Sequence, residues 1–251
     1  MNTLNTQKLA GKTALITGGS RGIGAGIAKR LAAEGAAVAF TYASAAGKAD
    51  EVVKAIESVG GRALAIQSDA ADASAVVQAI AQTIQTFGSI DILVNNAAFL
   101  SVAPLDKFTL EDFDRSVAVN VRAVFVASQE AARHMVEGGR IITIGSTNAD
   151  RMPFAGGGVY AMTKAAIVGL TKGLARDLGP RGITINNVQP GPINTDMNPD
   201  SGPFAETMKG FMALPRYGHV DEVAAMVAYL AGPEAAFITG ASLTIDGGFA
   251  A

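Results

Sequence analysis

Short apolar runs alternate along the chain with longer stretches in which apolar and polar residues are mixed. Residues that point to either side of such a run are apolar, as in Ile141–Ile144, so a strand formed there would be buried on both faces. Strands of this kind are typical of a parallel sheet covered by helices on each side. The predicted strands are Lys12–Thr17, Ala37–Thr41, Ala63–Ile66, Ile90–Val94, Ile141–Ile144, Ile183–Val188 and Ser242–Ile245.

The mixed stretches have the spacing of amphipathic helices. In the first of them Ile27 and Leu31 face the same side, and Gly35 closes the helix. Further helices are predicted over Val52–Val59, Ala75–Phe87, Leu110–Met135, Val159–Leu178 and Asp221–Leu230. Strands and helices in alternation, joined by right-handed crossovers, predict an α/β fold with a doubly wound parallel sheet of about seven strands.

One segment, residues 190–217, breaks this alternation because it carries five prolines and several glycines. Long irregular segments inside a compact domain are usually functional, so we expect this one to form a lid over a substrate. Its apolar residues fit either the wall of a pocket or the buried face of a short lid helix; they are Phe204, Met208, Phe211 and Met212. No linker composition divides residues 1–251, so a single domain is predicted.

Composition argues against several classes of function. The net charge is −2, so neither nucleic acid nor an anionic membrane surface is an expected partner. No apolar run approaches the roughly 18 residues of a membrane span, and the polar start does not resemble a signal peptide, so a cytoplasmic protein is expected. There is no cysteine and there are only two histidines, so no metal site is expected.

A glycine-rich turn follows the first predicted strand and opens the first predicted helix. Its sequence is Gly18-Gly19-Ser20-Arg21-Gly22-Ile23-Gly24. Backbone N–H groups and the positive end of the helix dipole attract an anion at such a turn, and glycines let a pyrophosphate approach closely. The turn therefore predicts the phosphate site of a bound nucleotide.

The same residues also match G-x-S-x-G, the pattern around the nucleophile of α/β-hydrolases. That alternative would make Ser20 the nucleophile and His219 its base. We reject it because such a serine needs an oxyanion donor from the loop of an earlier strand, and no strand is predicted before Lys12. An ordinary tight turn between strand and helix remains the other structural explanation.

Tyr160 and Lys164 lie four positions apart near the start of a predicted helix, and therefore on one of its faces. A free tyrosine has a pKa near about 10, and a neighbouring cation favours the phenolate. We expect Lys164 to lower the pKa of Tyr160, so that the pair exchanges a proton near neutral pH. Taken alone, the spacing equally fits an exposed tyrosine and a solvated lysine.

With these motifs, the chain resembles the short-chain dehydrogenases/reductases over essentially its whole length. The matching motifs, in the family's order, are Thr17-Gly18-x-x-x-Gly22-x-Gly24, Asn95-Asn96-Ala97-Ala98, Asn120, Ser146, Tyr160-x-x-x-Lys164 and Pro190-Gly191-Pro192-Ile193-Asn194-Thr195. The resemblance implies a single-domain Rossmann fold. Two positions depart from the family pattern: Ala98 replaces a glycine, and an extra residue before Tyr160 leaves Thr147 as an alternative to Ser146.

The resemblance also implies four catalytic residues. Tyr160 would be the proton donor, with Lys164 lowering its pKa and holding the ribose hydroxyls. Ser146 would donate a hydrogen bond to the substrate oxygen, and Asn120 would hold a water that links Lys164 to solvent.

A nicotinamide cofactor follows from the same resemblance. Enzymes of this architecture that use NAD carry an acidic residue about 20 positions after the glycine turn, but here the second strand ends without one. Arg21 matches the charge of a 2′-phosphate, so NADPH is expected over NADH. The residues expected to bind it are Gly18, Ser20, Arg21, Gly22, Ile23, Gly24, Tyr42, Ala43, Ser44, Asp69, Ala70, Asn96, Ala97, Tyr160, Lys164, Pro190, Gly191, Ile193 and Thr195.

The activity implied is reduction of a small, largely apolar ketone or aldehyde, as in carbonyl and 3-oxoacyl reductases, by a homotetramer. The expected pocket wall adds Phe99, Leu100, Phe154 and Val159 to the lid residues. Arg151 is either a contact for an anionic group or a solvated loop charge. A second hypothesis stays open, because one branch of the family includes a cyclic-di-GMP-binding mediator of biofilm dispersal: a nucleotide-binding regulator on the same fold.

Overall fold

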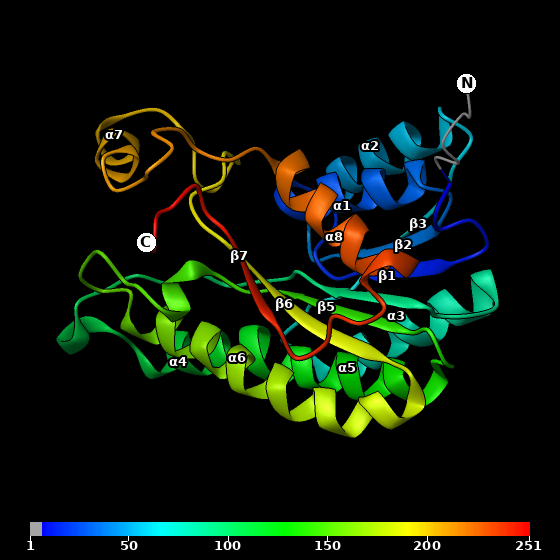
Figure 1. Cartoon of the computed structure of the whole chain (residues 1–251). Helices are drawn as coiled ribbons and strands as arrows, with labels where there is room; N and C mark the ends of the chain where they lie inside the picture. Colours follow the sequence, from blue (N-terminus) through cyan, green and yellow to red (C-terminus); the bar gives the residue numbers. More distant parts are fainter. Residues whose placement is uncertain (1–6) are drawn as a thin grey trace.

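A computed structural model describes residues 7–251, and its centre is one sheet of seven parallel strands (Figure 1). The strand order is β3-β2-β1-β4-β5-β6-β7, so the order reverses direction between β1 and β4. The strands are β1 (Thr13–Ile16), β2 (Ala37–Tyr42), β3 (Arg62–Gln67), β4 (Ile92–Asn95), β5 (Arg140–Ile144), β6 (Thr184–Pro190) and β7 (Ser242–Ile245). Each of these strands was predicted from its apolar run, and only the end residues differ.

Helices cover the sheet on both sides, as Figure 1 shows. The long helices are α1 (Gly22–Ala33), α2 (Ala46–Glu57), α3 (Ala73–Phe87), α4 (Leu110–Val117), α5 (Ala123–His134), α6 (Gly158–Leu178) and α8 (Val220–Ala231). Within residues 7–251, no helix is both long enough and apolar enough to cross a lipid bilayer.

The two layers of helices are built on alternate residues of the strands. In β1, Ala14 and Ile16 face the core under α1, α2 and α8, whereas Leu15 faces the core under α3, α5 and α6. Side chains of a strand point to opposite faces in turn, so the uninterrupted apolar run of β1 fills both cores. The sequence pattern therefore leads directly to the two-sided architecture.

A π-helical turn, Ala118–Arg122, interrupts the long helix that the sequence predicts over Leu110–Met135. It joins α4 to α5 and carries Asn120. A π turn inserts one extra residue per turn and is often found at functional sites. The sequence pattern did not reveal this interruption.

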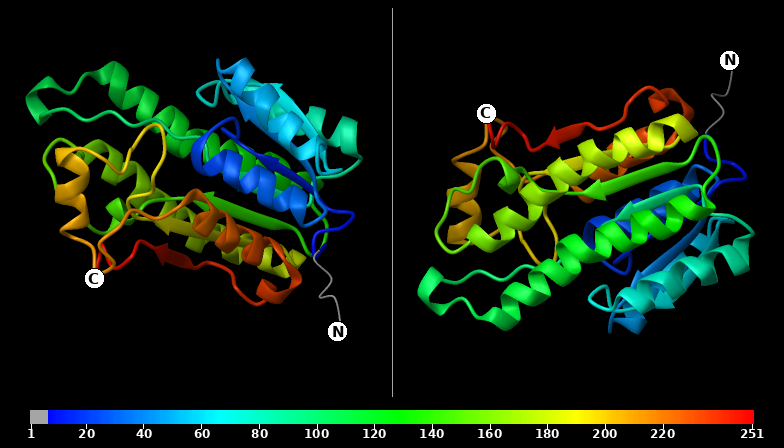
Figure 2. Two further views of the ribbon diagram at one scale, coloured as in Figure 1. Left: turned by 90° about the horizontal axis from the view of Figure 1, so that it is seen from above. Right: turned by 90° about the horizontal axis from the view of Figure 1, so that it is seen from below.

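The segment after β6 leaves the sheet and forms the predicted irregular region, with the short helix α7 (Pro203–Lys209) at its tip. Figures 1 and 2 show α7 standing apart from the sheet, with the C-terminal end of the chain beside it. The buried residues here form what we call the lid cluster, against which Phe154 packs: Ala205, Met208, Met212, Tyr217 and Phe249.

The lid cluster resolves the two roles expected for the apolar residues of this segment. Met208 and Met212 are buried in it, whereas 55% of Phe204 and 39% of Phe211 remain exposed. The methionines therefore form the core face of the lid, and the two phenylalanines lie at its surface.

Candidate active site

The glycine turn lies at the carboxyl end of β1, where the strand order reverses. Ligands of open α/β sheets bind in the crevice at this point. Gly22 begins α1 at a φ of +54°, a left-handed conformation that favours glycine. A Cβ on Gly24 would lie 2.3 Å from the Gly18 carbonyl oxygen, so any larger residue there would push the turn apart.

Threonine residues at the ends of neighbouring strands hold the turn in place through hydrogen bonds. The Thr41 hydroxyl accepts the N–H of Gly18 at 3.0 Å, and the Thr41 carbonyl accepts the N–H of Gly19 at 2.8 Å. Thr17 accepts the N–H groups of Asn96 and Ala97, at 3.0 and 3.1 Å. These bonds use the N–H groups of Gly18 and Gly19 and do not involve the N–H groups at the start of α1.

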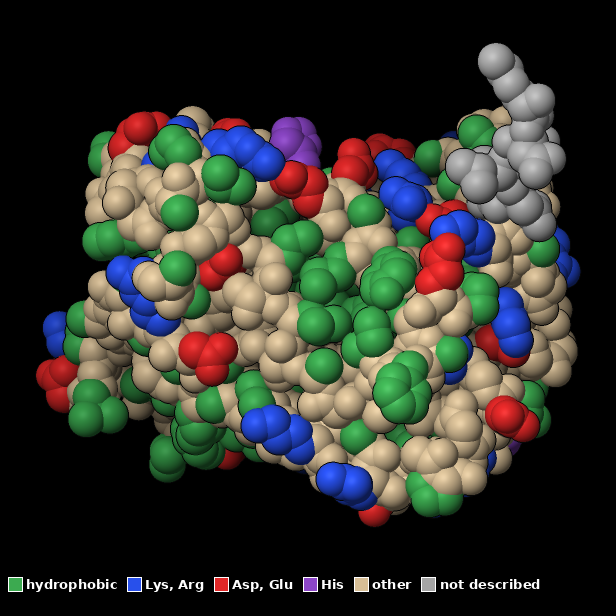
Figure 3. Space-filling model, in the orientation of Figure 1, with side chains coloured by type: hydrophobic (Ala, Val, Ile, Leu, Met, Phe, Trp, Pro, Cys, Tyr) green, Lys and Arg blue, Asp and Glu red, His purple; other side chains and the backbone are tan. Residues whose placement is uncertain are grey.

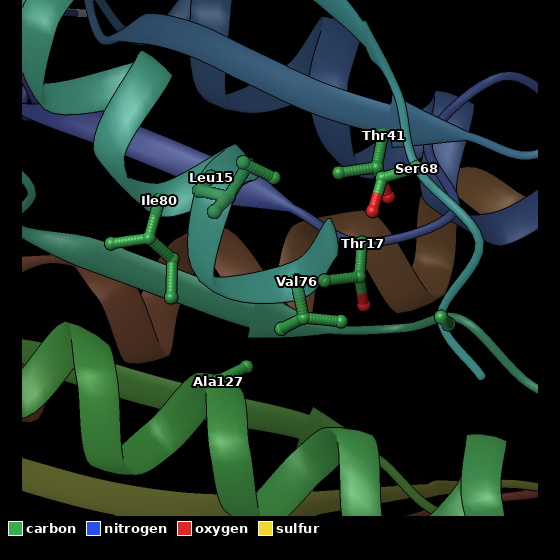
Figure 4. A pocket seen from close by; sticks show the side chains of 9 residues that line it. Leu15, Thr17, Thr41, Ser68, Val76, Ile80 and Ala127 are labelled. Atoms are coloured by element: carbon green, nitrogen blue, oxygen red, sulfur yellow. The ribbon is translucent and has the colours of Figure 1, made fainter. Parts of the chain in front are cut away.

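A small cavity of about 10 Å³ lies under the turn (Figure 4). Thr17, Thr41 and Ser68 gather at one end of it, while Leu15 and Ile80 form the other end. This volume is about that of one water molecule, so the cavity is a packing space and not the binding site.

Asn96 ties the loop after β4 to the turn. Its side-chain amide donates to the carbonyls of Thr17 and Gly18, at 3.0 and 2.8 Å. Ala97 lies close to the same place, because a Cβ on Gly18 would be 3.0 Å from the Ala97 Cα. The side chain of Asn96 is thus occupied by the turn, and its predicted contact with a nicotinamide stays a prediction.

Positive charge gathers near the end of β2, where no acidic residue follows Tyr42, Ala43 and Ser44. Lys48, in the first turn of α2, forms an ion pair with Asp196. That hydrogen bond, with a further contribution from the nearby positive charge of Arg21, holds the pKa of the Asp196 carboxyl below its usual range. Lys48 was not among the sequence-predicted residues.

Two predicted residues follow β3. The Asp69 carboxylate accepts the N–H of Ala71 at 2.9 Å and lies 3.7 Å from the guanidinium of Arg115. Ala70 lines the cavity under the turn. Asp69 is exposed, and a contact with adenine stays a prediction.

Tyr160, Lys164 and Ser146 meet at the carboxyl end of β5. The side chain of Tyr160 lies close to that of Ser146, which directly follows the strand and Gly145. The Lys164 ammonium lies 5.6 Å from the centroid of the Tyr160 ring and donates to the Ile144 carbonyl at 2.9 Å. The helical spacing of Tyr160 and Lys164 therefore does bring the phenol and the ammonium together.

The pKa values of this pair differ from the sequence expectation. Burial raises the pKa of Tyr160 above its ordinary value, and the neighbouring Ser146 side chain only partly opposes this effect. Burial also lowers the pKa of Lys164 to about 8. The expected lowering of the Tyr160 pKa was wrong for this structure, because burial raises it and Ser146, not Lys164, is the group that opposes the rise.

Thr147 cannot take the place of Ser146. Only 1% of Thr147 is exposed, and its hydroxyl donates to the Pro190 carbonyl at 3.2 Å. The hydroxyl of Ser146 instead meets Tyr160 and accepts the N–H of Asn148 at 3.1 Å.

Asn120, in the π turn, is 2% exposed and fully engaged. Its side chain accepts the N–H of Phe99 and donates to the Phe99 carbonyl, both at 2.8 Å, and also donates to the Thr163 hydroxyl at 3.1 Å. The side chain therefore anchors the loop after β4 to α6. Its expected link to Lys164 through a water stays a prediction.

The segment after β6 crosses back over the glycine turn. Pro190 ends the strand, and a Cβ on Gly191 would lie 2.6 Å from the Cβ of Asp246. The Ile193 side chain is buried, and a Cβ on Gly22 would lie 3.4 Å from the methyl group of Thr195. This crossing brings the predicted residues of the two halves of the chain to one crevice.

Comparison with known proteins decides the family. A family model described as enoyl-(acyl carrier protein) reductase matches residues 18–250. A solved short-chain dehydrogenase/reductase from Serratia marcescens has 63% sequence identity and a TM-score of 0.96, covering 97% of this chain and all of that one. The chain belongs to the short-chain dehydrogenase/reductase family. It is an enzyme fold with the family's Rossmann architecture.

Other members of the short-chain dehydrogenase/reductase family are similar over nearly the same length. A Burkholderia cenocepacia short-chain dehydrogenase solved in complex with NADP has 56% identity and a TM-score of 0.96, covering 97% of this chain and all of that one. A cyclic-di-GMP-binding biofilm dispersal mediator protein of Escherichia coli is 51% identical over 96% of this chain and 98% of its own. A 3-oxoacyl-[acyl-carrier-protein] reductase of Synechocystis is 41% identical over 96% and 97%.

Within this short-chain dehydrogenase/reductase, Arg151 takes neither of the roles expected for it. Its guanidinium lies 5.5 Å from the ring centroid of Phe211 and 5.3 Å from that of Phe249. It also donates a hydrogen bond to the Phe249 carbonyl. Arg151 is therefore a stacked, half-buried residue and not a solvated loop charge; its partners lie far along the chain, so no local pattern could have found them.

Proposed function

We propose that the protein reduces the carbonyl group of a small, largely apolar ketone or aldehyde with NADPH, and that Tyr160 is the proton donor. One arrangement carries the proposal: the Tyr160 side chain lies beside Ser146, and the buried Lys164 ammonium lies 5.6 Å from the centroid of the Tyr160 ring. Because burial raises the pKa of Tyr160, the phenol keeps its proton at neutral pH. A proton donor must be in this state when a reduction begins.

The residues of the crevice fit NADPH. At the glycine turn, the lack of room for a Cβ at Gly24 and the N–H groups at the start of α1 suit a pyrophosphate. Arg21 provides positive charge for a 2′-phosphate, whereas Lys48 is paired with Asp196, and the end of β2 offers no carboxylate to hold a free 2′-hydroxyl. The NADP complex of the Burkholderia relative supports the same choice.

The chemistry divides between cofactor and protein. When bound, NADPH supplies the hydride that goes to the carbonyl carbon of the substrate. Tyr160 gives its proton to the carbonyl oxygen, which becomes the hydroxyl of the product. Ser146 donates a hydrogen bond to that oxygen as negative charge develops on it, and the Lys164 ammonium stabilises the phenolate that Tyr160 leaves behind.

The surroundings favour an uncharged substrate. Phe99, Leu100, Phe154 and Val159 come from loops and the helix start around Tyr160, and Phe204 contacts Phe154 edge to face with ring centroids 5.9 Å apart. The Arg151 guanidinium lies beside the rings of Phe211 and Phe249 and donates to the Phe249 carbonyl, so it is already engaged within the protein instead of being free for a substrate carboxylate or phosphate. Segment 190–217, with α7 at its tip, is proposed as the lid.

The test is Tyr160→Phe, which removes the transferable proton and little else. We expect the variant to bind NADPH with the same Kd as the parent. Both proteins should bind NADPH at least about tenfold more tightly than NADH, since a charged contact with the 2′-phosphate is worth roughly that factor. Turnover over a panel of apolar ketones and aldehydes, followed by NADPH oxidation, should fall by about 100-fold or more, the usual range for a general acid. Turnover within threefold of the parent would refute the assignment.

A second candidate function is binding of cyclic-di-GMP as a regulator, with turnover incidental. The similarity to the Escherichia coli biofilm dispersal mediator favours it. Calorimetric titration of the parent protein with cyclic-di-GMP, with and without NADPH, tests this function separately. A micromolar Kd together with no turnover over the ketone panel would make the regulator the better description.

We also propose a homotetramer, supported by two apolar faces. The outer side of α5 and α6 forms an apolar groove lined by Phe125, Leu170 and the small residues Gly169 and Gly173. On another face, hydrophobic side chains gather over α8 and beside β7 (Figure 3), and 48% of Tyr229 in α8 is exposed. Exposed apolar patches of this kind mark interaction surfaces.

A further inference from the structure

Arg151 lies where three distant parts of the chain meet. Its backbone belongs to the segment after Ser146, while the two rings beside its guanidinium, which also contact each other edge to face, come from the lid segment (Phe211) and from the residues after β7 (Phe249). Its guanidinium also donates to the Phe249 carbonyl. A planar guanidinium that stacks on rings while donating hydrogen bonds fits this position, and an ammonium does not.

On one side, Arg151 is fixed to the segment that carries Ser146. The N–H of Arg151 donates to the Thr147 carbonyl at 2.9 Å. The Gln189 side chain, in β6, donates to the Ser146 carbonyl at 3.1 Å and to the Asp150 carboxylate at 3.0 Å. This side of the contact is therefore tied to the sheet.

On the other side, the residues after β7 are folded onto the lid. The Asp246 carboxylate accepts the N–H groups of Gly248 and Ala250, at 2.9 and 2.8 Å, which shapes a compact tail. The N–H of Leu214, in the lid segment, donates to the Gly247 carbonyl at 2.8 Å. Phe249 is 2% exposed within the lid cluster, so the tail and the lid form one packed unit.

We propose that Arg151 is a positioning residue that fastens this unit of lid and tail to the segment carrying Ser146. Near its tip the lid also meets the body through Phe154, which packs on the lid cluster and contacts Phe204 edge to face with ring centroids 5.9 Å apart. Loss of the guanidinium would let the lid open more often, and substrate would be held less tightly while the groups around Tyr160 stay in place. The effect on substrate binding rests on the proposed function; the effect on the lid does not.

The lid is tested first, by limited trypsin digestion of the protein without ligands. Lys209 and Arg216 lie in the lid segment; Lys209 pairs with Glu206 of the same segment, and Arg216 binds Glu222 of α8 through two hydrogen bonds of 2.9 and 2.7 Å. In Arg151→Met we expect cleavage after these residues to be about tenfold faster, as two cation–π contacts and one charged hydrogen bond imply. Arg151→Lys, which keeps the charge without the planar stack, should lie between Arg151→Met and the parent.

The matched control is Arg62→Met. Arg62 also stacks on a phenylalanine, 5.3 Å from the ring centroid of Phe87, but lies at the start of β3 on the far edge of the sheet. In Arg62→Met, trypsin should cleave the lid at the same rate as in the parent protein. Circular dichroism checks that Arg151→Met is folded. If its lid is then cleaved at a rate within twofold of the rates in the parent and in Arg62→Met, the proposal is overturned.

Kinetics then test the consequence for the pocket. With a ketone that the parent reduces, Arg151→Met should raise KM about tenfold while kcat and the Kd for NADPH stay within about threefold, because the lost contacts hold the lid and not the reacting groups. Faster lid cleavage with an unchanged KM would overturn the claim that this contact controls the pocket. Absence of turnover in the parent itself would count against the proposed function, and the digestion would still decide the role of Arg151.

Discussion

At the scale of single residues, Lys164 shows how burial decides chemistry that spacing alone cannot. The sequence places it one turn from Tyr160, and the structure confirms that the two side chains are neighbours. The sequence could not show that only 4% of Lys164 is exposed, or that each of the two groups has its pKa shifted by its own burial. The expected direction of the Tyr160 pKa shift was wrong for that reason.

The burial of Lys164 makes a prediction about stability. Its pKa is about 8 in the folded protein, below the ordinary 10.5. Between these two values the unfolded chain holds a proton that the folded chain does not, so stability rises with pH in that window. Relative to Lys164→Met, which has no such proton, the parent should gain about 2 kcal/mol between pH 7 and pH 10.

Urea unfolding of both proteins without ligand at these two pH values measures this gain. The comparison cancels every titration that the two proteins share. A difference in unfolding free energy that stays constant with pH would show that the Lys164 ammonium is not destabilised by burial.

At the scale of elements, the alternation of apolar runs and amphipathic stretches was enough to predict every strand and long helix. Interruptions were harder to predict, because they depend on contacts made elsewhere. The π turn around Asn120 exists where that side chain bonds to Phe99 and Thr163, which are 21 and 43 positions away along the chain. The contacts of Arg151 and Lys48 could not be predicted for the same reason, since their partners come from other elements.

The glycine turn gives a prediction for α1. In Gly24→Ala, the new methyl group would meet the Gly18 carbonyl and the Asn96 amide, at 2.3 and 2.5 Å from an ideal Cβ. We expect a loss of about 2 kcal/mol or more in unfolding free energy and a weaker NADPH complex, since the turn must open to relieve the clash.

Gly47→Ala is the matched control for this substitution. Gly47 lies in the first turn of α2, and nothing would be within 4 Å of its Cβ. Alanine there should leave stability unchanged or raise it by up to about 1 kcal/mol. Thermal unfolding and NADPH titration of both variants measure these effects. If Gly24→Ala had the same stability and the same affinity for NADPH as Gly47→Ala, the prediction would be wrong.

At the scale of the whole molecule, the carboxyl ends of parallel strands gather residues that are far apart in sequence. The turn after β1, Ser146 after β5 and Thr195 after β6 come to one crevice by this rule alone. The motifs could therefore be assigned to one site before the structure was known. The lid could not be described in the same way, because Phe249 reaches it from beyond the last strand.

The apolar faces predict the assembly. The parent should sediment as four copies of the 25.5 kDa chain, held in part by the groove on α5 and α6. Gly169→Arg should reduce it to a smaller species, because a charged side chain in an apolar interface is costly. A Cβ on Gly169 has open space within the protomer, so the fold itself should tolerate the change.

Val59→Arg controls for the added charge. Val59 is 73% exposed and follows α2, away from both apolar faces. Sedimentation velocity should find this variant in the same state as the parent. A Gly169→Arg protein of parental mass would rule out an assembly through α5 and α6.

The contact between Arg151 and Phe249 joins residues 98 positions apart. This separation determines at what stage of translation the protein can complete its folding. The glycine turn and its neighbouring strands come from the first part of the nascent chain, whereas the lid cluster must wait until β7 and Phe249 have left the ribosome. Because α8 covers the core around β1, we expect the nucleotide half to gain resistance to protease only after α8 has emerged, and the lid cluster to gain it last.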